Sequence, residues 1–163
     1  MRAMGTEIKV EVNGVVESRE VEGNQTLLSF LRDTLDLTGA KEGCNEGECG
    51  SCVVLLDGRP VNGCLTLAVE ADGREVTTIE GLGHSRSLHP LQAAFLRHHA
   101  VQCGFCTPGM LMQGVGFLRT HPTPTAEEAR CAIEGNVCRC TGYETIVRAL
   151  LAAARAMGEG ESQ

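Results

Sequence analysis

The sequence contains few aromatic side chains: among 163 residues there is no Trp, one Tyr and four Phe. Large apolar side chains provide much of the area that a small domain buries, so this chain has a thin core for its length. Small domains with thin cores are commonly stabilised by covalent or metal crosslinks. The shortage of aromatic residues therefore directs attention to residues that can form crosslinks.

A basic surface and long apolar runs are also missing. The formal net charge is −7 and the isoelectric point is about 5.2, which argues against a nucleic-acid partner. No apolar stretch approaches the roughly 20 residues of a transmembrane helix, and the start of the chain lacks the apolar segment of a signal peptide. We therefore expect a cytoplasmic protein with no transmembrane segment, for which membrane association would require a partner.

The two halves of the chain have different hydrophobic periodicities. In the first half the pattern alternates as in strands, with one segment of helical spacing, and this predicts an α+β domain. In the second half every segment has helical spacing, which predicts a small helical bundle. We place the boundary so that residues 1–82 and 83–163 form separate domains. The expected strands lie at 8–12, 15–21, 53–56 and 75–79, and the expected helices at 25–38, 89–99, from 107, from 125 and 141–157.

Several short signals fix the expected ends of these elements. Asn13-Gly14 and Asp57-Gly58 are hairpin turns, and Gly39 is expected to end the first helix. Thr107 is expected to cap the helix that Pro108 begins. Capping boxes are expected where Thr125 precedes Glu128 and where Thr141 precedes Glu144.

Cysteine is abundant, with nine residues, and the first set lies in the segment GCNEGECGSC. Thiols stay reduced in the cytosol, which favours metal ligands over disulfides. The spacing Cys44-x4-Cys49-x2-Cys52, with Cys64 after eleven intervening residues, is typical of plant-type [2Fe–2S] proteins. Zinc is the rival metal, but its four-cysteine sites use paired short knuckles. The spacing favours a cluster.

Glycines surround this first set. A [2Fe–2S] centre with four thiolates carries a formal charge of about −2, so backbone N–H groups must point at the sulfur atoms. That requires a loop that wraps closely and visits positive φ, which Gly43, Gly47 and Gly50 permit. Glu46 and Glu48 are expected to be solvated rather than functional.

The second set consists of Cys103-x2-Cys106 and, after 31 intervening residues, Cys138-x-Cys140. Each pair precedes an expected helix start, where the helix dipole favours thiolate over thiol. The spacing by itself leaves [2Fe–2S] and zinc both open, with the cluster favoured.

The remaining cysteine, Cys131, falls within an expected helix and is interpreted as a buried apolar residue. Gly114 and Gly116, in another expected helix, indicate close approach by a neighbouring helix or by the first domain.

Three segments, GCNEGECGSC, VQCGFCTPGM and GNVCRCTGY, resemble the iron–sulfur small subunit of the molybdenum hydroxylases, the family of xanthine dehydrogenase, aldehyde oxidoreductase and carbon monoxide dehydrogenase. The resemblance extends from about Ile8 to Ala156. It implies an N-terminal β-grasp, plant-type ferredoxin-like domain and a C-terminal four-helix bundle, each with one [2Fe–2S] cluster. The implied ligands are Cys44, Cys49, Cys52 and Cys64 for the first cluster, and Cys103, Cys106, Cys138 and Cys140 for the second.

The resemblance also implies partners. A large subunit would hold a molybdenum–pterin cofactor, with Gln102 and Cys140 nearest to it, and a medium subunit would hold FAD. The assembly would be a dimer of heterotrimers. The chain would then be the electron-transfer subunit of an oxidoreductase, passing electrons singly from the pterin centre to FAD.

No residues in this chain suggest substrate chemistry of its own. The substrate, whether an N-heteroaromatic compound, an aldehyde, carbon monoxide or an aromatic acyl-CoA, would be set by the large subunit. The alternatives are a free-standing two-cluster ferredoxin that serves several partners and a zinc-stabilised interaction module.

Overall fold

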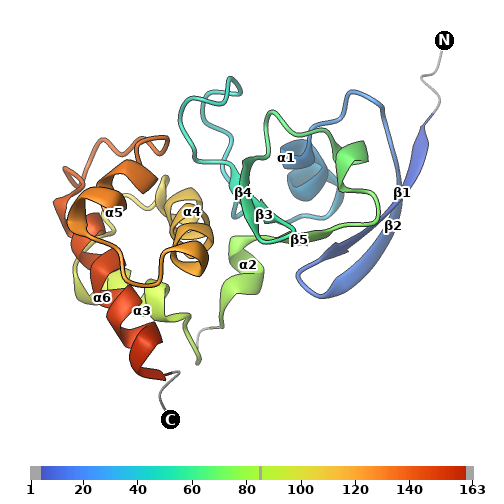
Figure 1. Ribbon diagram of the computed structural model, residues 1–163. Helices are drawn as coiled ribbons and strands as arrows, with labels where there is room; N and C mark the ends of the chain where they lie inside the picture. The colour runs from blue at the N-terminus through green and yellow to red at the C-terminus, as the bar shows by residue number, and fades with distance from the viewer. Residues whose placement is uncertain (1–4, 85, 161–163) are drawn as a thin grey trace.

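A computed structural model describes residues 5–84 and 86–160. The first part contains a sheet, and the second part contains helices that pack beside it (Figure 1). This arrangement confirms the predicted α+β class. Within these ranges no helix is both long enough and apolar enough to cross a membrane.

The first part is a mixed sheet with five strands in the order β2-β1-β5-β3-β4. β1 pairs with β5 in parallel, and the other neighbours are antiparallel. Both predicted hairpins are present, with Asn13 and Asp57 at positive φ in the turns. The strand expected at 75–79 stops at Thr77, and Ile79 begins a helix instead. The strands are β1 Thr6–Val12, β2 Val15–Val21, β3 Val53–Leu56, β4 Arg59–Asn62 and β5 Glu75–Thr77.

The helix expected over 25–38 is shorter than predicted. It consists of α1 Leu27–Ser29, a π-helical turn over Phe30–Thr34, and no further helix. The chain turns away at Asp36, which has a φ of 57°, so Gly39 does not end the helix. The Arg32 guanidinium donates to the carbonyls of Thr38 and Ala40 and thereby holds the segment that leads into the cysteine loop.

The second part contains the helices α3 to α6, and α2 precedes it. The predicted starts of two of these helices were wrong. Cys106, not Thr107, is the N-cap of α4. α6 begins at Glu144 without the expected capping box, because Tyr143 has a φ of 69° and its hydroxyl accepts a hydrogen bond from the Cys138 N–H. The helices are α2 Ile79–Leu82, α3 Pro90–Arg97, α4 Thr107–Thr120, α5 Ala126–Ala132 and α6 Glu144–Gly160, and a 3-10 turn covers Ala68–Ala71.

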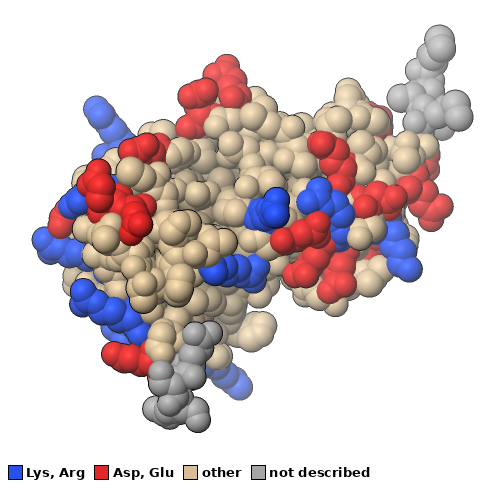
Figure 2. All heavy atoms as spheres, viewed as in Figure 1, with Lys and Arg blue, Asp and Glu red and all other residues tan. Residues whose placement is uncertain are grey.

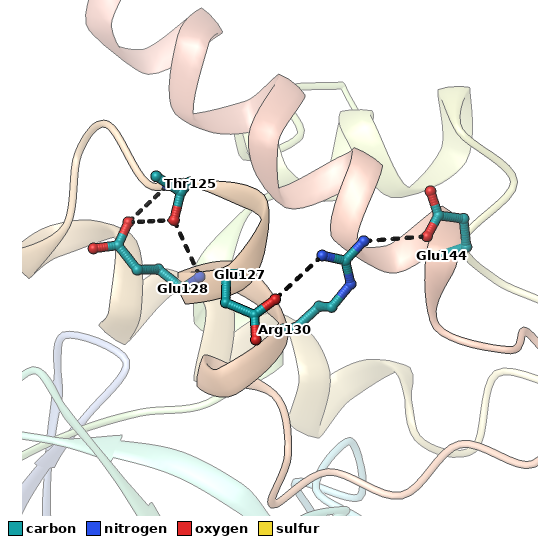
Figure 3. Close-up of polar contacts among 5 residues, drawn as sticks. All are labelled: Thr125, Glu127, Glu128, Arg130 and Glu144. Atoms are coloured by element: carbon teal, nitrogen blue, oxygen red, sulfur yellow. Dashed lines mark hydrogen bonds and ion pairs between the residues drawn. The ribbon is translucent and has the colours of Figure 1, made fainter.

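The capping box at the start of α5 is present as predicted. The Thr125 hydroxyl accepts from the Glu128 N–H at 3.2 Å, and the Glu128 carboxylate accepts from the Thr125 N–H at 2.7 Å (Figure 3). The Thr125 N–H, and after it the Thr125 hydroxyl, donate to the Glu128 carboxylate and hold its pKa below its ordinary value. Arg130 on the same helix pairs with Glu127 and reaches Glu144 at the start of α6. The contacts orient α5 against α6.

β3 is buried on both faces and joins the two parts. Its sequence VVLL has no polar position because Val54 and Leu56 pack into the sheet-domain core, whereas Val53 and Leu55 pack with the helices. On the helical side α4 lies against β3, and a Cβ on Gly116 would collide with Pro60 and approach Leu55. The expected close approach is confirmed: Gly116 meets the sheet domain, and Gly114 meets side chains from α3 and α6.

The acidic residues are unevenly distributed. Residues 1–82 contain 15 Asp and Glu against seven Lys and Arg, whereas residues 83–163 contain six against seven. Acidic side chains accordingly gather over the strands in Figure 2, while the helices carry mixed charge.

Candidate metal centres

The first cysteine set converges as two pairs of thiols. Cys44 interacts with Cys49, and Cys52 interacts with Cys64, while Cys49 is close enough to Cys52 to affect its charge. Cys44 and Cys49 are half-buried, and Cys52 and Cys64 are buried. The site thus has an outer pair near solvent and an inner pair against the sheet-domain core.

Backbone N–H groups converge on the outer pair, as the sequence predicted. The Glu46 N–H lies 3.4 Å from Cys44 Sγ. This N–H, followed by those of Cys49 and Glu48, lowers the pKa of Cys44 to about 7. The side chains of Glu46 and Glu48 point to solvent, so these residues contribute their backbones rather than their carboxylates. The loop therefore stabilises negative charge on sulfur despite its acidic composition.

Two glycines show why the loop is glycine-rich. Gly47 has a φ of 80°, a conformation that strains any residue with a Cβ. Gly43 does not adopt positive φ, contrary to one expected role, but a Cβ there would lie 2.7 Å from Cys49 Sγ. Gly43 therefore provides room for the close wrap.

Cys52 of the inner pair is less acidic than Cys44 of the outer pair. Burial, with a smaller contribution from Cys64, raises the pKa of Cys52 to about 11. A thiol of this kind is protonated at neutral pH, so metal binding here must displace a proton. Asn62 lies beside the pair, with its Oδ1 4.0 Å from Cys52 Sγ, and its amide also donates to the Gly47 carbonyl. Asn62 therefore ties the loop to β4.

The second set also converges as two pairs, although 31 residues separate Cys106 from Cys138. The sulfur atoms of Cys103 and Cys140 lie 3.6 Å apart, and both residues are exposed. Cys106 interacts with Cys138, which is buried. The packing of α4 beside the loop before α6 thus reproduces the arrangement of the first site, with an outer and an inner pair.

Local contacts distinguish the two inner thiols of this site. Burial raises the pKa of Cys106 to about 12, and its hydrogen bond with Cys138 acts in the same direction. Burial also opposes ionisation of Cys138, but hydrogen bonds from the Thr141 side chain and from backbone N–H groups outweigh it and lower the pKa. Thr141 Oγ1 lies 3.1 Å from Cys138 Sγ. The turn at Thr141 therefore serves the cysteine site rather than capping α6.

The paired arrangement bears on which metal fits. One zinc ion with four thiolates at about 2.3 Å would bring all four sulfur atoms within about 3.8 Å of one another. Two irons, each taking two thiolates, need two separate pairs, and each site offers them. The thiol pairs of both sets fit the ligand arrangement of a binuclear iron–sulfur cluster.

Contacts that the sequence did not predict join the two sites. The Val137 N–H donates to the Cys49 carbonyl at 2.9 Å, and the Asn136 side chain donates to the Gly50 carbonyl at the same distance. Asn136 is 2% exposed, which is unusual for an amide side chain. The motif GNVCRC contains this residue, but only tertiary structure shows that it reaches the other cysteine loop.

The other singled-out residues are placed as follows. Gln102 is exposed beside Cys103, on the outer side of the second site. Cys131 lies in α5 as expected, but the prediction that it is buried was wrong. α5 buries Ala129, and a residue two positions along a helix points to the opposite side.

Comparison with protein families agrees with two cluster-binding units. Residues 10–78 match the model of the 2Fe-2S iron-sulfur cluster binding domain. Residues 78–151 match the model of the [2Fe-2S] binding domain. Each match contains one complete cysteine set.

Individual relatives extend over most of the chain. The nicotine 6-hydroxylase small subunit of Paenarthrobacter nicotinovorans is 51% identical over 152 residues, which are 93% of this chain and 92% of that protein. Subunit beta of the 6-hydroxypseudooxynicotine dehydrogenase complex of the same organism is 50% identical over 87% of this chain and 89% of its own length.

Solved structures give the same result. A chain of quinoline 2-oxidoreductase from Pseudomonas putida 86 has a TM-score of 0.91 and 46% identity, over 97% of this chain and 99% of that chain. The aldehyde oxidoreductase from Desulfovibrio gigas has a TM-score of 0.92 and 41% identity, and there the match covers 95% of this chain but 17% of the longer one. Taken with the paired thiols, these matches show that the chain belongs to the iron–sulfur small subunits of the molybdenum hydroxylases and is a subunit of an oxidoreductase complex.

Proposed function

We propose that this subunit carries electrons one at a time from a molybdenum–pterin centre in a large subunit to FAD in a medium subunit. Each [2Fe–2S] cluster, when bound, supplies a one-electron redox centre. Residues 1–82 would form a plant-type ferredoxin-like domain of the β-grasp class, and residues 83–163 a four-helix bundle. Each domain would hold one cluster.

The proposed ligands follow the thiol pairs. In the first domain Cys44 and Cys49 would bind one iron, and Cys52 and Cys64 the other. In the second domain the corresponding pairs are Cys103 with Cys140 and Cys106 with Cys138. The backbone N–H groups around Cys44 and the hydroxyl of Thr141 near Cys138 would stabilise the thiolates and set the reduction potentials.

The observation that carries the proposal is the hydrogen bond from Val137 N–H to the Cys49 carbonyl. Cys49 belongs to the first set, and Val137 is covalently joined to Cys138 of the second. A path of covalent bonds with this one hydrogen bond therefore links the two sites. A protein that binds two metals only for stability has no need of such a path, whereas an electron relay does.

The outer pair of the second site is exposed, which indicates where electrons enter the subunit. Cys103 and Cys140 are exposed, and beside them Gln102 and the 49%-exposed Phe105 reach the surface. We propose that this face meets the large subunit, with Gln102 and Cys140 next to the pterin. The outer pair of the first site would then face the flavin subunit.

The substrate would be bound by the large subunit. Relatives named for nicotine, quinoline and aldehyde chemistry share between 41% and 51% identity with this chain, so the identities do not single out one substrate class. This chain serves the family's electron transfer whether the substrate is an N-heteroaromatic compound, an aldehyde, carbon monoxide or an aromatic acyl-CoA.

The test is to purify the complex through an affinity tag on this chain. We expect about four irons and four acid-labile sulfides per chain, two rhombic EPR signals after reduction, and co-purifying molybdenum and flavin. Quinoline, nicotine and benzaldehyde serve as test substrates for flavin reduction. Native mass measurement tests the dimer of heterotrimers.

Two outcomes would contradict the proposal. Purification of an iron-loaded chain without molybdenum or flavin would favour the free-standing two-cluster ferredoxin. A colourless protein with stoichiometric zinc would exclude electron transfer altogether.

A further inference from the structure

Asn136 is one of three buried polar residues of the described chain, with Ser51 and Thr78. Its Nδ2 donates to the Gly50 carbonyl at 2.9 Å, across 86 positions of sequence, inside the contact between the two parts. A buried carbonyl that loses its donor costs roughly 1–3 kcal/mol. This bond therefore opposes separation of the two loops.

Asn136 and Gly50 are the sequence neighbours of the two residues whose backbones join the cysteine sites. Gly50 follows Cys49, and Asn136 precedes Val137. The hydrogen bond from the Asn136 side chain to Gly50 therefore lies next to the hydrogen bond from Val137 N–H to the Cys49 carbonyl. In each of the two loops, the residues that form the two bonds are adjacent in sequence. Whatever fixes Gly50 against Asn136 also fixes Cys49 against Val137.

Asn136 is itself held rigidly at the end of α5. Its backbone N–H donates to the Ile133 carbonyl at 3.0 Å. Ile133 is buried in the helical core, so the amide has a fixed base.

Gly50 is closely packed between the loop that contains Asn136 and the start of α4. Its φ is 65°, and a Cβ there would collide with the Gly135 carbonyl and the Asn136 amide. A Cβ on Gly109, in the first turn of α4, would collide with the Gly50 carbonyl. Gly50 therefore fits between α4 and the Asn136 loop with no spare room.

We infer that Asn136 is a positioning residue for electron transfer between the two sites, an inference that rests on the proposed relay function. Its amide keeps the Val137–Cys49 hydrogen bond closed. Tunnelling across a hydrogen bond is faster than tunnelling across an open gap, because electronic coupling falls steeply with distance between atoms. Loss of the amide donor thus lengthens the one non-covalent step of the path while leaving all eight thiols in place.

The chain offers a matched control in Gln113. Its Nε2 donates to the Ala132 carbonyl at 2.9 Å, which joins α4 to the end of α5 within the helical part. Gln113→Ala removes an amide-to-carbonyl bond of the same kind and length, without touching the contact between the sites. A purely structural role for Asn136 predicts similar effects for the two substitutions.

The experiment compares Asn136→Asp, Asn136→Ala and Gln113→Ala in the complete purified complex. Asn136→Asp keeps the shape but replaces the donor with an acceptor. Two measurements are made: the spin–spin splitting between the two clusters in the dithionite-reduced complex, and the rate of flavin reduction by whichever of quinoline, nicotine or benzaldehyde the wild-type complex oxidises. The splitting needs no substrate, so the test does not depend on finding one.

We expect full iron content in all three variants. In both Asn136 variants the splitting should weaken and flavin reduction should slow by roughly 10- to 100-fold, as for other residues that orient metal ligands. Gln113→Ala should match wild type in both measurements.

Three results would overturn the inference. Unchanged splitting and rate in the Asn136 variants, or equal losses in Gln113→Ala, would show that the amide does not set the path. Loss of iron from both Asn136 variants would show that it holds the sites together instead. Failure of the proposed function is distinct, because it would appear in the wild-type complex as absent iron, molybdenum or flavin.

Discussion

The two cysteine sites reach the same paired arrangement by different routes. The first lies mostly in one ten-residue loop, where glycines and backbone N–H groups do the positioning. The second joins two pairs 31 residues apart and depends on how α4 packs beside the loop before α6. A site built from a loop should fail when its backbone is strained, whereas a site built from packing should fail when helices move.

The largest effect is expected from removing a ligand of one site only. Cys140→Ser should lower iron from about four to about two per chain, abolish the EPR signal of the second cluster and stop flavin reduction by substrate. The first cluster should keep its signal, since the first loop completes its site without Cys140. EPR and iron analysis of the purified complex check this.

Cys52→Ser is the reciprocal variant and should remove only the first signal. Loss of both signals in either variant would contradict independent sites. The two sites could then not be treated as one formed by a loop and one formed by helix packing.

A smaller effect is expected from Gly116→Ala in α4. The new methyl group would collide with Pro60 and displace α4 from the sheet domain, which should cost about 1–3 kcal/mol of unfolding free energy. Gly158→Ala in α6 is the control, because an added Cβ there would meet no described atom within 4 Å outside its chain neighbours and its own helix backbone, and helix propensity predicts a gain of up to about 1 kcal/mol. Thermal unfolding of both variants measures the difference, and equal stability would refute close packing at Gly116.

Straining the first loop should have a comparable or smaller cost, confined to one site. Gly47→Ala places a Cβ residue at a φ of 80°, which costs about 1–2 kcal/mol, and its methyl group would also meet Leu65. Gly73→Ala has a φ of 70° with open space around it, so it carries the strain without the collision. Only Gly47→Ala should weaken the first EPR signal. Weakening of the second signal instead would contradict the local origin of the first site.

The smallest effect is expected from Thr125→Ala. It removes the side-chain half of the capping box and should cost about 1 kcal/mol, because the Glu128 N–H loses its acceptor. Because α5 leads into Asn136 and the second cysteine site, the EPR signal of the second cluster should broaden before that of the first cluster. Thr123→Ala in the preceding loop, for which no cap bond is found in the described structure, should change the unfolding temperature less. A larger loss in Thr123→Ala would contradict the cap.

Prediction from sequence succeeded where one short segment determines its own conformation. Both hairpins, the VVLL strand and the Thr125 capping box depend on residues at most a few positions apart. It failed where distant contacts compete with local preference. The 25–38 segment has helical periodicity but leaves the helix at Asp36, and Thr141 contacts Cys138 instead of capping α6. The burial of Cys131 was mispredicted because helical periodicity alone did not show which face of α5 meets the core.

The sequence by itself determined which thiols could hold iron, since cysteine spacing and surrounding glycines follow from the chemistry of an anionic cluster, and three motifs were enough to indicate the family. Only the tertiary structure decided that the thiols form pairs and that the two sites touch. The reason is physical: the hydrogen bonds from Val137 to Cys49 and from Asn136 to Gly50 join residues more than 80 positions apart. No periodicity or spacing within either segment encodes contacts of that range.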